Sequence, residues 1–145
     1  MTATHVDEFR ASLERCLAAS AFLNDFYDSF VASSDEIREK FRHTNFDRQK
    51  RILTDSLYLM AVAAQGGHDS IAWRELKRIA KRHEELGIGG VMYDVWLDCL
   101  LRAAETHDRE FSPSLEMAWR ATLAPGIEHM RAVQQSEREN REHQG

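Results

Sequence analysis

Apolar residues recur every three or four positions along most of this 145-residue chain. This spacing places them on one face of an α-helix. The chain contains only 7 glycines and 2 prolines, so long uninterrupted helices can form. Residues that favour helices, such as Ala, Leu, Glu and Arg, are plentiful, whereas β-branched residues are sparse. The pattern therefore predicts an all-α protein in which residues 1–145 form a single domain.

Capping and breaking residues divide this pattern into about six to eight helices. A polar corner over residues 41–45, which holds one large aromatic side chain, separates the third helix from the fourth. The expected helices span about residues 9–21, 22–31, 33–40, 46–64, 69–87, 91–106 and 112–136.

Several of the expected helices begin at recognisable capping residues. Ser33 and Glu36 have the spacing of a capping box, in which each side chain bonds a free backbone amide at the helix start. Thr44 and Asp47 suggest a similar start for the fourth helix, and Asp69 is the candidate cap of the fifth.

The expected helix ends follow from glycine and proline. Gly66-Gly67 should stop the fourth helix, and Gly87 should end the fifth in the left-handed conformation that glycine adopts without strain. Ser112-Pro113 should cap and open the last helix. Pro125-Gly126 should kink or break that helix, and the polar tail from about Glu137 should fray.

Charge and cysteine usage exclude several classes of protein. The formal net charge of −5 argues against bulk nucleic-acid binding, which requires a basic surface. The N-terminus has no apolar signal region, and no apolar run is long enough to span a membrane, so a cytoplasmic location is the default expectation. Cys16 and Cys99 lie in apolar helical stretches and are interpreted as small core residues; no CxxCH motif for covalent heme attachment occurs.

His83 is the strongest candidate for a functional side chain. It lies on the apolar stripe of its helix, one turn after Ile79 and Ala80 and one turn before Gly87, so we expect it to be buried. A buried histidine either bonds a backbone carbonyl in the core or presents a neutral imidazole to a metal. Its position alone leaves both interpretations open.

Residues at fixed spacing from His83 carry a resemblance to a known family. Tyr27 precedes Phe41 by fourteen residues, and Tyr93 follows His83 by ten. Together with the segments RHEELGI at 82–88 and YDVWLDCLL at 93–101, they resemble the bacterial single-domain globins and the globin part of flavohemoglobins. The resemblance covers about residues 17–131.

The resemblance implies a globin fold that encloses heme b. His83 would bind the iron on the proximal side. Phe41 would stack on the porphyrin, although an ordinary core aromatic residue is the alternative. Tyr27 and Gln49 would donate hydrogen bonds to a ligand on the opposite, distal side. For Tyr27 the alternative is a core tyrosine bonded to a carbonyl, and for Gln49 it is a surface residue.

Two further residues take supporting roles under the same resemblance. Leu53 would form an apolar lid one turn after Gln49. Tyr93 would lie beneath the heme and orient the imidazole of His83. Flavohemoglobins also carry a glutamate on the last helix that polarises the proximal histidine, and no match to it stands near Ser136.

Three functions are consistent with these residues. The first is binding of dioxygen, carbon monoxide or nitric oxide at the heme, with nitric oxide dioxygenase or peroxidase-like turnover if an external reductant is supplied. The second is a heme-based gas or redox sensor that acts through a partner protein. The third is a heme-free globin-like interaction module, against which the pairing of His83 with Phe41 argues. Neither nucleic acid nor a membrane is an expected partner. The sequence leaves open whether the protein forms a homodimer.

Overall fold

The computed structural model describes residues 4–66 and 70–144, and within these ranges it contains seven α-helices and no strand. Residues in the described ranges alternate between helices and short connections, as the periodicity predicts. The helices are α1 (His5–Ala18), α2 (Phe22–Ala32), α3 (Asp35–Lys40), α4 (Phe46–Gln65), α5 (Ile71–Glu85), α6 (Val91–His107) and α7 (Pro113–Gln144).

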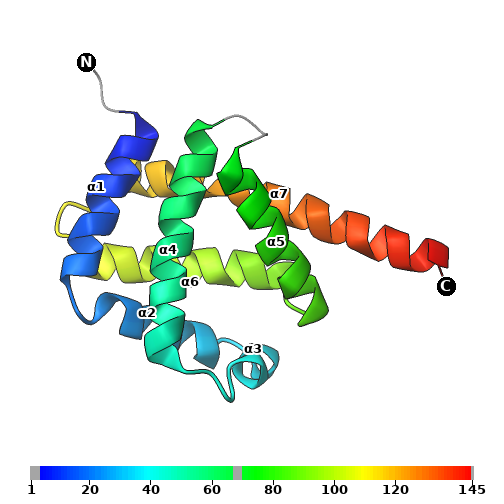
Figure 1. Ribbon diagram of the computed structural model, residues 1–145. Coiled ribbons are helices and arrows are strands. Elements are labelled where there is room, and N and C mark those ends of the chain that lie inside the picture. Colours follow the sequence, from blue (N-terminus) through cyan, green and yellow to red (C-terminus); the bar gives the residue numbers. More distant parts are fainter. Residues whose placement is uncertain (1–3, 67–69, 145) are drawn as a thin grey trace.

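The helices cross one another in two layers (Figure 1). In this view α1, α4 and α5 lie in front and cross the long helices α6 and α7 behind them, while α2 and the short α3 lie below. Helix α7 contacts α1, α4 and α5, and α2 packs on α6. The far end of α7 extends beyond the other helices toward the C-terminus.

Aromatic side chains fill the centre of this arrangement. The rings of Phe9 on α1 and Trp119 on α7 meet edge to face, with centroids 4.7 Å apart. Phe22 and Phe26 of α2 are fully buried. Cys16 and Cys99 are buried and unpaired, so the expectation that they are core residues is confirmed. No helix in the described ranges is both long and apolar enough to cross a membrane.

Two predicted helix caps are displaced by one residue. Ser34, not Ser33, caps α3 and accepts a hydrogen bond from the Ile37 amide, while the Ser33 hydroxyl donates to the Phe30 carbonyl at the end of α2. Asn45, not Thr44, caps α4 and accepts from the Arg48 amide. In both cases the neighbouring polar residue has the extended backbone that a cap requires.

Both ends of α5, the helix that carries His83, are well defined. Ser70 caps its start, and the predicted cap Asp69 lies outside the described residues. At its other end Gly87 adopts a φ of 73°, which confirms the predicted left-handed stop. The Ile88 amide then donates to the carbonyl of His83 at 2.8 Å, so the last turn of the helix is closed around this residue.

Of the two outcomes predicted for Pro125-Gly126, a kink or a break, the break does not occur, because α7 continues through Pro125. Proline removes only one helical hydrogen bond. The adjacent Gly126 is buried, and a Cβ built there would lie 3.0 Å from a terminal carbon of Met60 on α4. Helix α7 is therefore closely packed on α4 just after Pro125.

The tail from Glu137, which the sequence predicts to fray, is helical through Gln144 in this structure. Glu137 pairs with Lys81 at 3.5 Å, and Arg141 pairs with Glu84 at 2.7 Å. Both partners lie on α5, so the end of α7 is tied to the helix that carries His83. Such ties between distant segments have no sequence signature.

A buried polar cluster joins α1 to the turn between α6 and α7. The Asp108 side chain is fully buried and accepts hydrogen bonds from Ser12 and, at 2.6 Å, from Arg15. The Trp119 indole donates to the Ser12 hydroxyl at 2.9 Å. Burial alone would raise the pKa of Asp108, but the bonds from Arg15, Ser12 and the Glu110 amide lower it below its usual value.

We predict that Asp108→Ala lowers the free energy of unfolding at neutral pH by about 2 kcal/mol, because hydrogen bonds to a buried charge are lost. The folded pKa of Asp108 lies below the unfolded one, so its contribution is complete above the unfolded pKa and disappears as pH falls through the folded pKa. Urea unfolding at pH 7 and in acid measures the difference. Asp35→Ala, which removes an exposed ion pair with Arg38, is the control. If the loss of unfolding free energy in Asp108→Ala were as large in acid as at pH 7, the lowered pKa of Asp108 would be contradicted.

Candidate functional site

His83 lies in the last turn of α5 and is partly buried beneath the corner that leads to α6. Burial lowers the pKa of His83 from its ordinary value of 6.5 to about 4, because the charged imidazolium loses water without gaining a counter-ion. The imidazole is therefore uncharged at neutral pH and has a lone pair free for a metal or a hydrogen bond.

Tyr93 of α6 fixes one side of this imidazole. Its hydroxyl lies 3.2 Å from Nδ1 of His83. Burial raises the pKa of Tyr93 to about 12, so the phenol remains protonated. No described residue hydrogen-bonds the other ring nitrogen, Nε2. The structure thus brings His83 and Tyr93 together, as predicted. It leaves the lone pair of His83 Nε2 available to bind a metal.

A second cluster of predicted residues lies at the meeting point of α2, α3 and α4. The Tyr27 hydroxyl donates to the backbone carbonyl of Gln49 at 3.3 Å, and burial raises the pKa of Tyr27 to about 12. Phe41, in the corner after α3, lies edge to face against Tyr27 with ring centroids 6.0 Å apart. Leu53 is buried one turn after Gln49. Tyr27, Phe41 and Gln49 are therefore neighbours.

A hydrogen bond connects the segment beside the aromatic cluster around Tyr27 to the end of the helix that carries His83. The ammonium group of Lys40, at the end of α3, donates to the Leu86 carbonyl just after α5 at 2.9 Å. Lys40 was not singled out by the sequence, because nothing in its exposed, charged surroundings indicates a partner 46 residues away.

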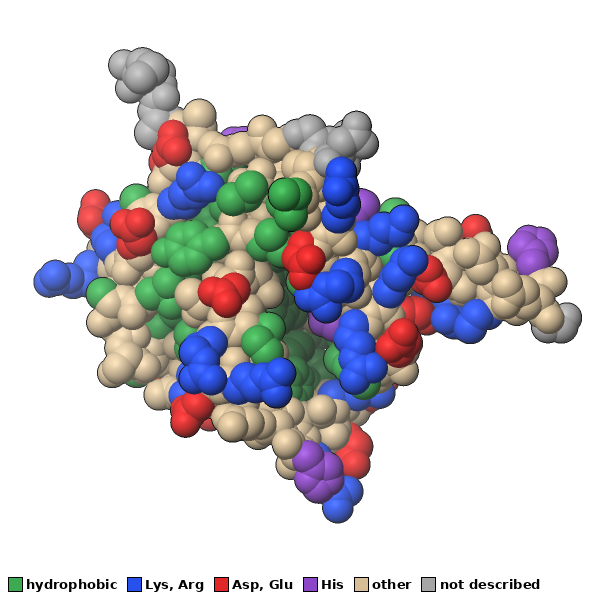
Figure 2. Space-filling model, viewed as in Figure 1, with side chains coloured by type: hydrophobic (Ala, Val, Ile, Leu, Met, Phe, Trp, Pro, Cys, Tyr) green, Lys and Arg blue, Asp and Glu red, His purple; other side chains and the backbone are tan. Residues whose placement is uncertain are grey.

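Between α4 and α5 the surface is hollowed (Figure 2). Hydrophobic side chains form the floor of this hollow, and Lys and Arg side chains stand on both of its sides. The predicted residues Gln49 and Leu53 lie on α4, and His83 lies on α5. The hollow therefore separates the two helices that carry them.

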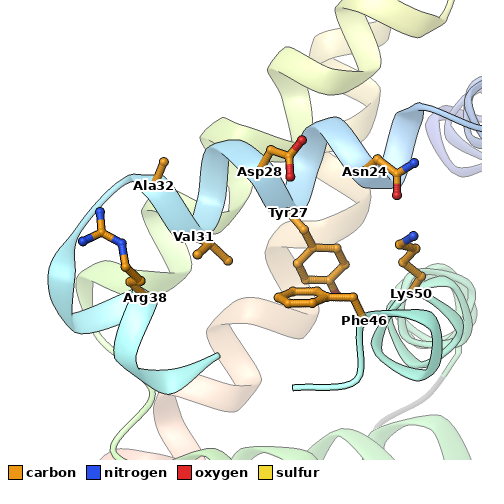
Figure 3. A pocket seen from close by; sticks show the side chains of 8 residues that line it. All are labelled: Asn24, Tyr27, Asp28, Val31, Ala32, Arg38, Phe46 and Lys50. Atoms are coloured by element: carbon orange, nitrogen blue, oxygen red, sulfur yellow. The ribbon is translucent and has the colours of Figure 1, made fainter. Parts of the chain in front are cut away.

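A separate cavity of about 440 Å³ lies on the outer side of Tyr27 (Figure 3). The rings of Tyr27 and Phe46 lie close together in its middle, between α2 and the start of α4. Val31 projects from α2 beside them, and Arg38 and Lys50 lie toward opposite ends. The cavity is also lined by Asn24, Asp28 and Ala32.

Gln134 of α7 is a buried polar residue near His83 that the sequence analysis missed. Its amide donates to the Ile88 carbonyl at 2.7 Å and to the Ala80 carbonyl at 3.4 Å. A Cβ at Gly89 would lie 2.9 Å from Oε1 of Gln134, so the corner is closely packed on this amide. The spacing of Gln134 after Ile127 places it on the inner face of the helix, which is the signal that could have identified it.

The metal-ligating side chains near His83 limit the kind of metal group that could bind there. Among residues 4–66 and 70–144, no three His, Cys, Asp or Glu side chains are grouped as a metal site would require. His83 could thus hold only a metal whose other ligands come from elsewhere, such as a planar macrocycle. An apolar hollow beside one neutral imidazole fits that chemistry, and the aromatic ring of Phe41 offers a surface for stacking.

A solved structure with the same overall fold decides the family. It is a crystal structure of a protein from Pseudomonas aeruginosa PAO1, described as structurally highly homologous to a human hemoglobin. It superposes on this chain with a TM-score of 0.83 and 34% sequence identity over 90% of this chain and 98% of that one. The chain belongs to the globin family.

No family model matches the sequence of this globin. Nor does any curated protein match it. The all-helical globin fold expected from the sequence is confirmed, and the seven helices of the described ranges lie within the expected six to eight.

We predict that His83 of the cofactor-free globin titrates near pH 4 when followed by NMR. Because its folded pKa is below the unfolded value, the unfolded state takes up the proton first, and stability falls as pH drops from about 6.5 toward 4. His83→Gln removes this group, so its unfolding free energy should change less over that range. A His83 midpoint near 6.5 would contradict the burial of the imidazole.

Proposed function

We propose that this globin binds heme b through Nε2 of His83 and uses it to bind dioxygen and other diatomic gases. The observation that carries the proposal is the uncharged imidazole of His83, which has Tyr93 at Nδ1 and no partner at Nε2 among the described residues. When bound, heme supplies an iron centre at which diatomic ligands bind reversibly.

Tyr93 would select the tautomer that this role needs. If Nδ1 carries the proton and donates it to the Tyr93 oxygen, the lone pair of His83 resides on Nε2. Gln134 of α7 bonds the Ile88 and Ala80 carbonyls, so α7 is tied to the corner that joins the helices of His83 and Tyr93. These contacts support a preorganised proximal ligand.

The remaining predicted residues supply the wall opposite His83. Phe41 offers its ring for stacking, and Leu53 contributes an apolar surface. Tyr27 and Gln49 are the hydrogen-bond donors that we assign to the gas ligand. The similarity to a protein described as structurally highly homologous to a human hemoglobin supports heme binding in general.

We expect the variant His83→Ala to lose its heme. Purified wild-type protein should show a Soret band that shifts on adding carbon monoxide, whereas the variant should show little heme after identical expression and reconstitution, because the single protein ligand is absent. His143→Ala, at the exposed end of α7, is the control and should retain full heme content. Equal pigment in His83→Ala and wild type would overturn the proposal.

The variant Tyr27→Phe should release dioxygen about tenfold faster, because one hydrogen bond of about 1.4 kcal/mol to the ligand is removed. Stopped-flow displacement of dioxygen by carbon monoxide measures this rate. Tyr58→Phe, on α4 and outside the cluster, is the matched control. An unchanged release rate in Tyr27→Phe would show that this hydroxyl remains on the Gln49 carbonyl and does not reach the ligand.

A further inference from the structure

Positive charge is concentrated in one part of this acidic chain. Residues 38–82 hold 11 Lys and Arg side chains against 5 Asp and Glu, whereas the whole chain holds 19 against 24. This segment includes α4 and most of α5, the two helices on either side of the hollow (Figure 2). The positive charge therefore lies on the face that opens toward the proposed heme site.

The Lys and Arg side chains of these two helices point into solvent. Figure 2 shows that they stand on both sides of the hollow. On α5 they recur at helical spacing, and on α4 they occupy the first two turns. We call this set of exposed cations the basic face: Arg48, Arg51, Arg74, Lys77, Arg78, Lys81 and Arg82.

Several cations of the basic face have no carboxylate of their own chain to neutralise them. Arg78 and Arg82 pair with glutamates of α5 itself, and Lys81 pairs with one on α7. Within the part of the chain that the structure describes, no carboxylate forms an ion pair with Arg48, Arg51 or Lys77. The two carboxylates of a heme b would offset at most two charges of the excess of six in residues 38–82. The face would thus stay positive with heme bound.

Apolar side chains are exposed next to these cations. Ile52, which follows Arg51 on α4, is 45% exposed, and Leu86, at the end of α5, is 43% exposed. A small interface in which charges surround a few apolar contacts is suited to a short-lived complex, because long-range attraction brings the partners together and little area holds them.

The proposed heme requires an electron from another molecule. Dioxygen binds to ferrous iron, so iron that has become ferric must regain one electron before it can bind the gas again. Cys16 and Cys99 are both buried, on α1 and α6, and form no thiol pair that could supply it. A donor that approaches the hollow has to meet the basic face.

We propose that the basic face is the docking surface for a small acidic protein that carries single electrons. The inference rests on the proposed function, because the electron passes to the heme iron of that site. One electron leaves the reduced carrier and converts ferric iron to ferrous iron, and no covalent bond forms or breaks. Carboxylates on the carrier complement the unpaired cations and raise the rate of encounter at low ionic strength.

The test reverses charge on the basic face without changing the residues that we assign to the heme. It uses one triple variant at the cations without an ion pair: Arg48→Glu, Arg51→Glu and Lys77→Glu. The corresponding glutamine variants take its place if charge reversal prevents folding.

A second triple variant is the matched control. It changes the net charge by the same amount at exposed positions outside α4 and α5: Arg102→Glu, Arg109→Glu and Arg138→Glu. Any effect of overall charge alone would appear equally in both triple variants.

Stopped-flow mixing of the ferric globin with reduced flavodoxin, an acidic one-electron carrier, measures the bimolecular rate of reduction. At low ionic strength we expect reduction of the basic-face variant to be about tenfold slower than that of wild type, and added salt to slow the wild type. Photoreduced deazariboflavin, which is uncharged, should reduce all three proteins at one rate. Equal rates with flavodoxin in the two triple variants would overturn the proposal.

Binding of oxidised flavodoxin gives a readout that needs neither electron transfer nor heme. At low ionic strength it should shift backbone amide resonances of α4 and α5 in NMR spectra of the wild type but not of the basic-face variant. Shifts confined to α6 and α7 would overturn the proposal. So would duplex DNA or anionic lipid vesicles that bind the same face as tightly, because the face would then select any polyanion.

The two failures are distinguishable. A wild type without any Soret band would contradict heme binding itself, whereas binding of flavodoxin to the basic face can still be measured on that protein. A wild type that holds heme but whose reduction by flavodoxin is independent of salt would overturn the docking surface alone.

Discussion

The burial of one uncharged imidazole is the interaction on which the site depends. His83 is partly buried, and this burial lowers its pKa from 6.5 to about 4, so the imidazole is uncharged at neutral pH. Its position requires the end of α5 to close at Gly87 and the Tyr93 hydroxyl to meet Nδ1. Gln134 of α7 secures that corner from behind, so three helices determine the environment of a single ring.

The long last helix has a larger structural role than its polar sequence suggests. It packs on α1, α4 and α5, and its terminal turns pair with α5 through Glu137 and Arg141. These exposed pairs contribute little stability individually. The buried contact of Gly126 with Met60 of α4 and the amide of Gln134 at the corner after α5 bind α7 to these helices more firmly, because both are shielded from water.

Tyr27 stands between the proposed heme site and the outer cavity. Its hydroxyl bonds Gln49, and its ring forms part of the wall of the cavity. Phe46, which the sequence analysis did not single out, shares this wall, because a ring at the start of α4 also packs against Phe41.

The helices and most of their ends could be predicted from the order of residues, whereas the contacts between distant helices could not. Apolar spacing located the helices, and Gly87 stopped α5 because glycine adopts its backbone conformation without strain. Prediction was weaker at Ser33 and Thr44, where adjacent polar residues compete for the same cap. The continuity of α7 past Pro125 and the position of Gln134 against the corner after α5 emerged from the folded chain. Local propensity reflects the free energy of one segment, but these features follow from burial against other helices, which a helical pattern cannot report.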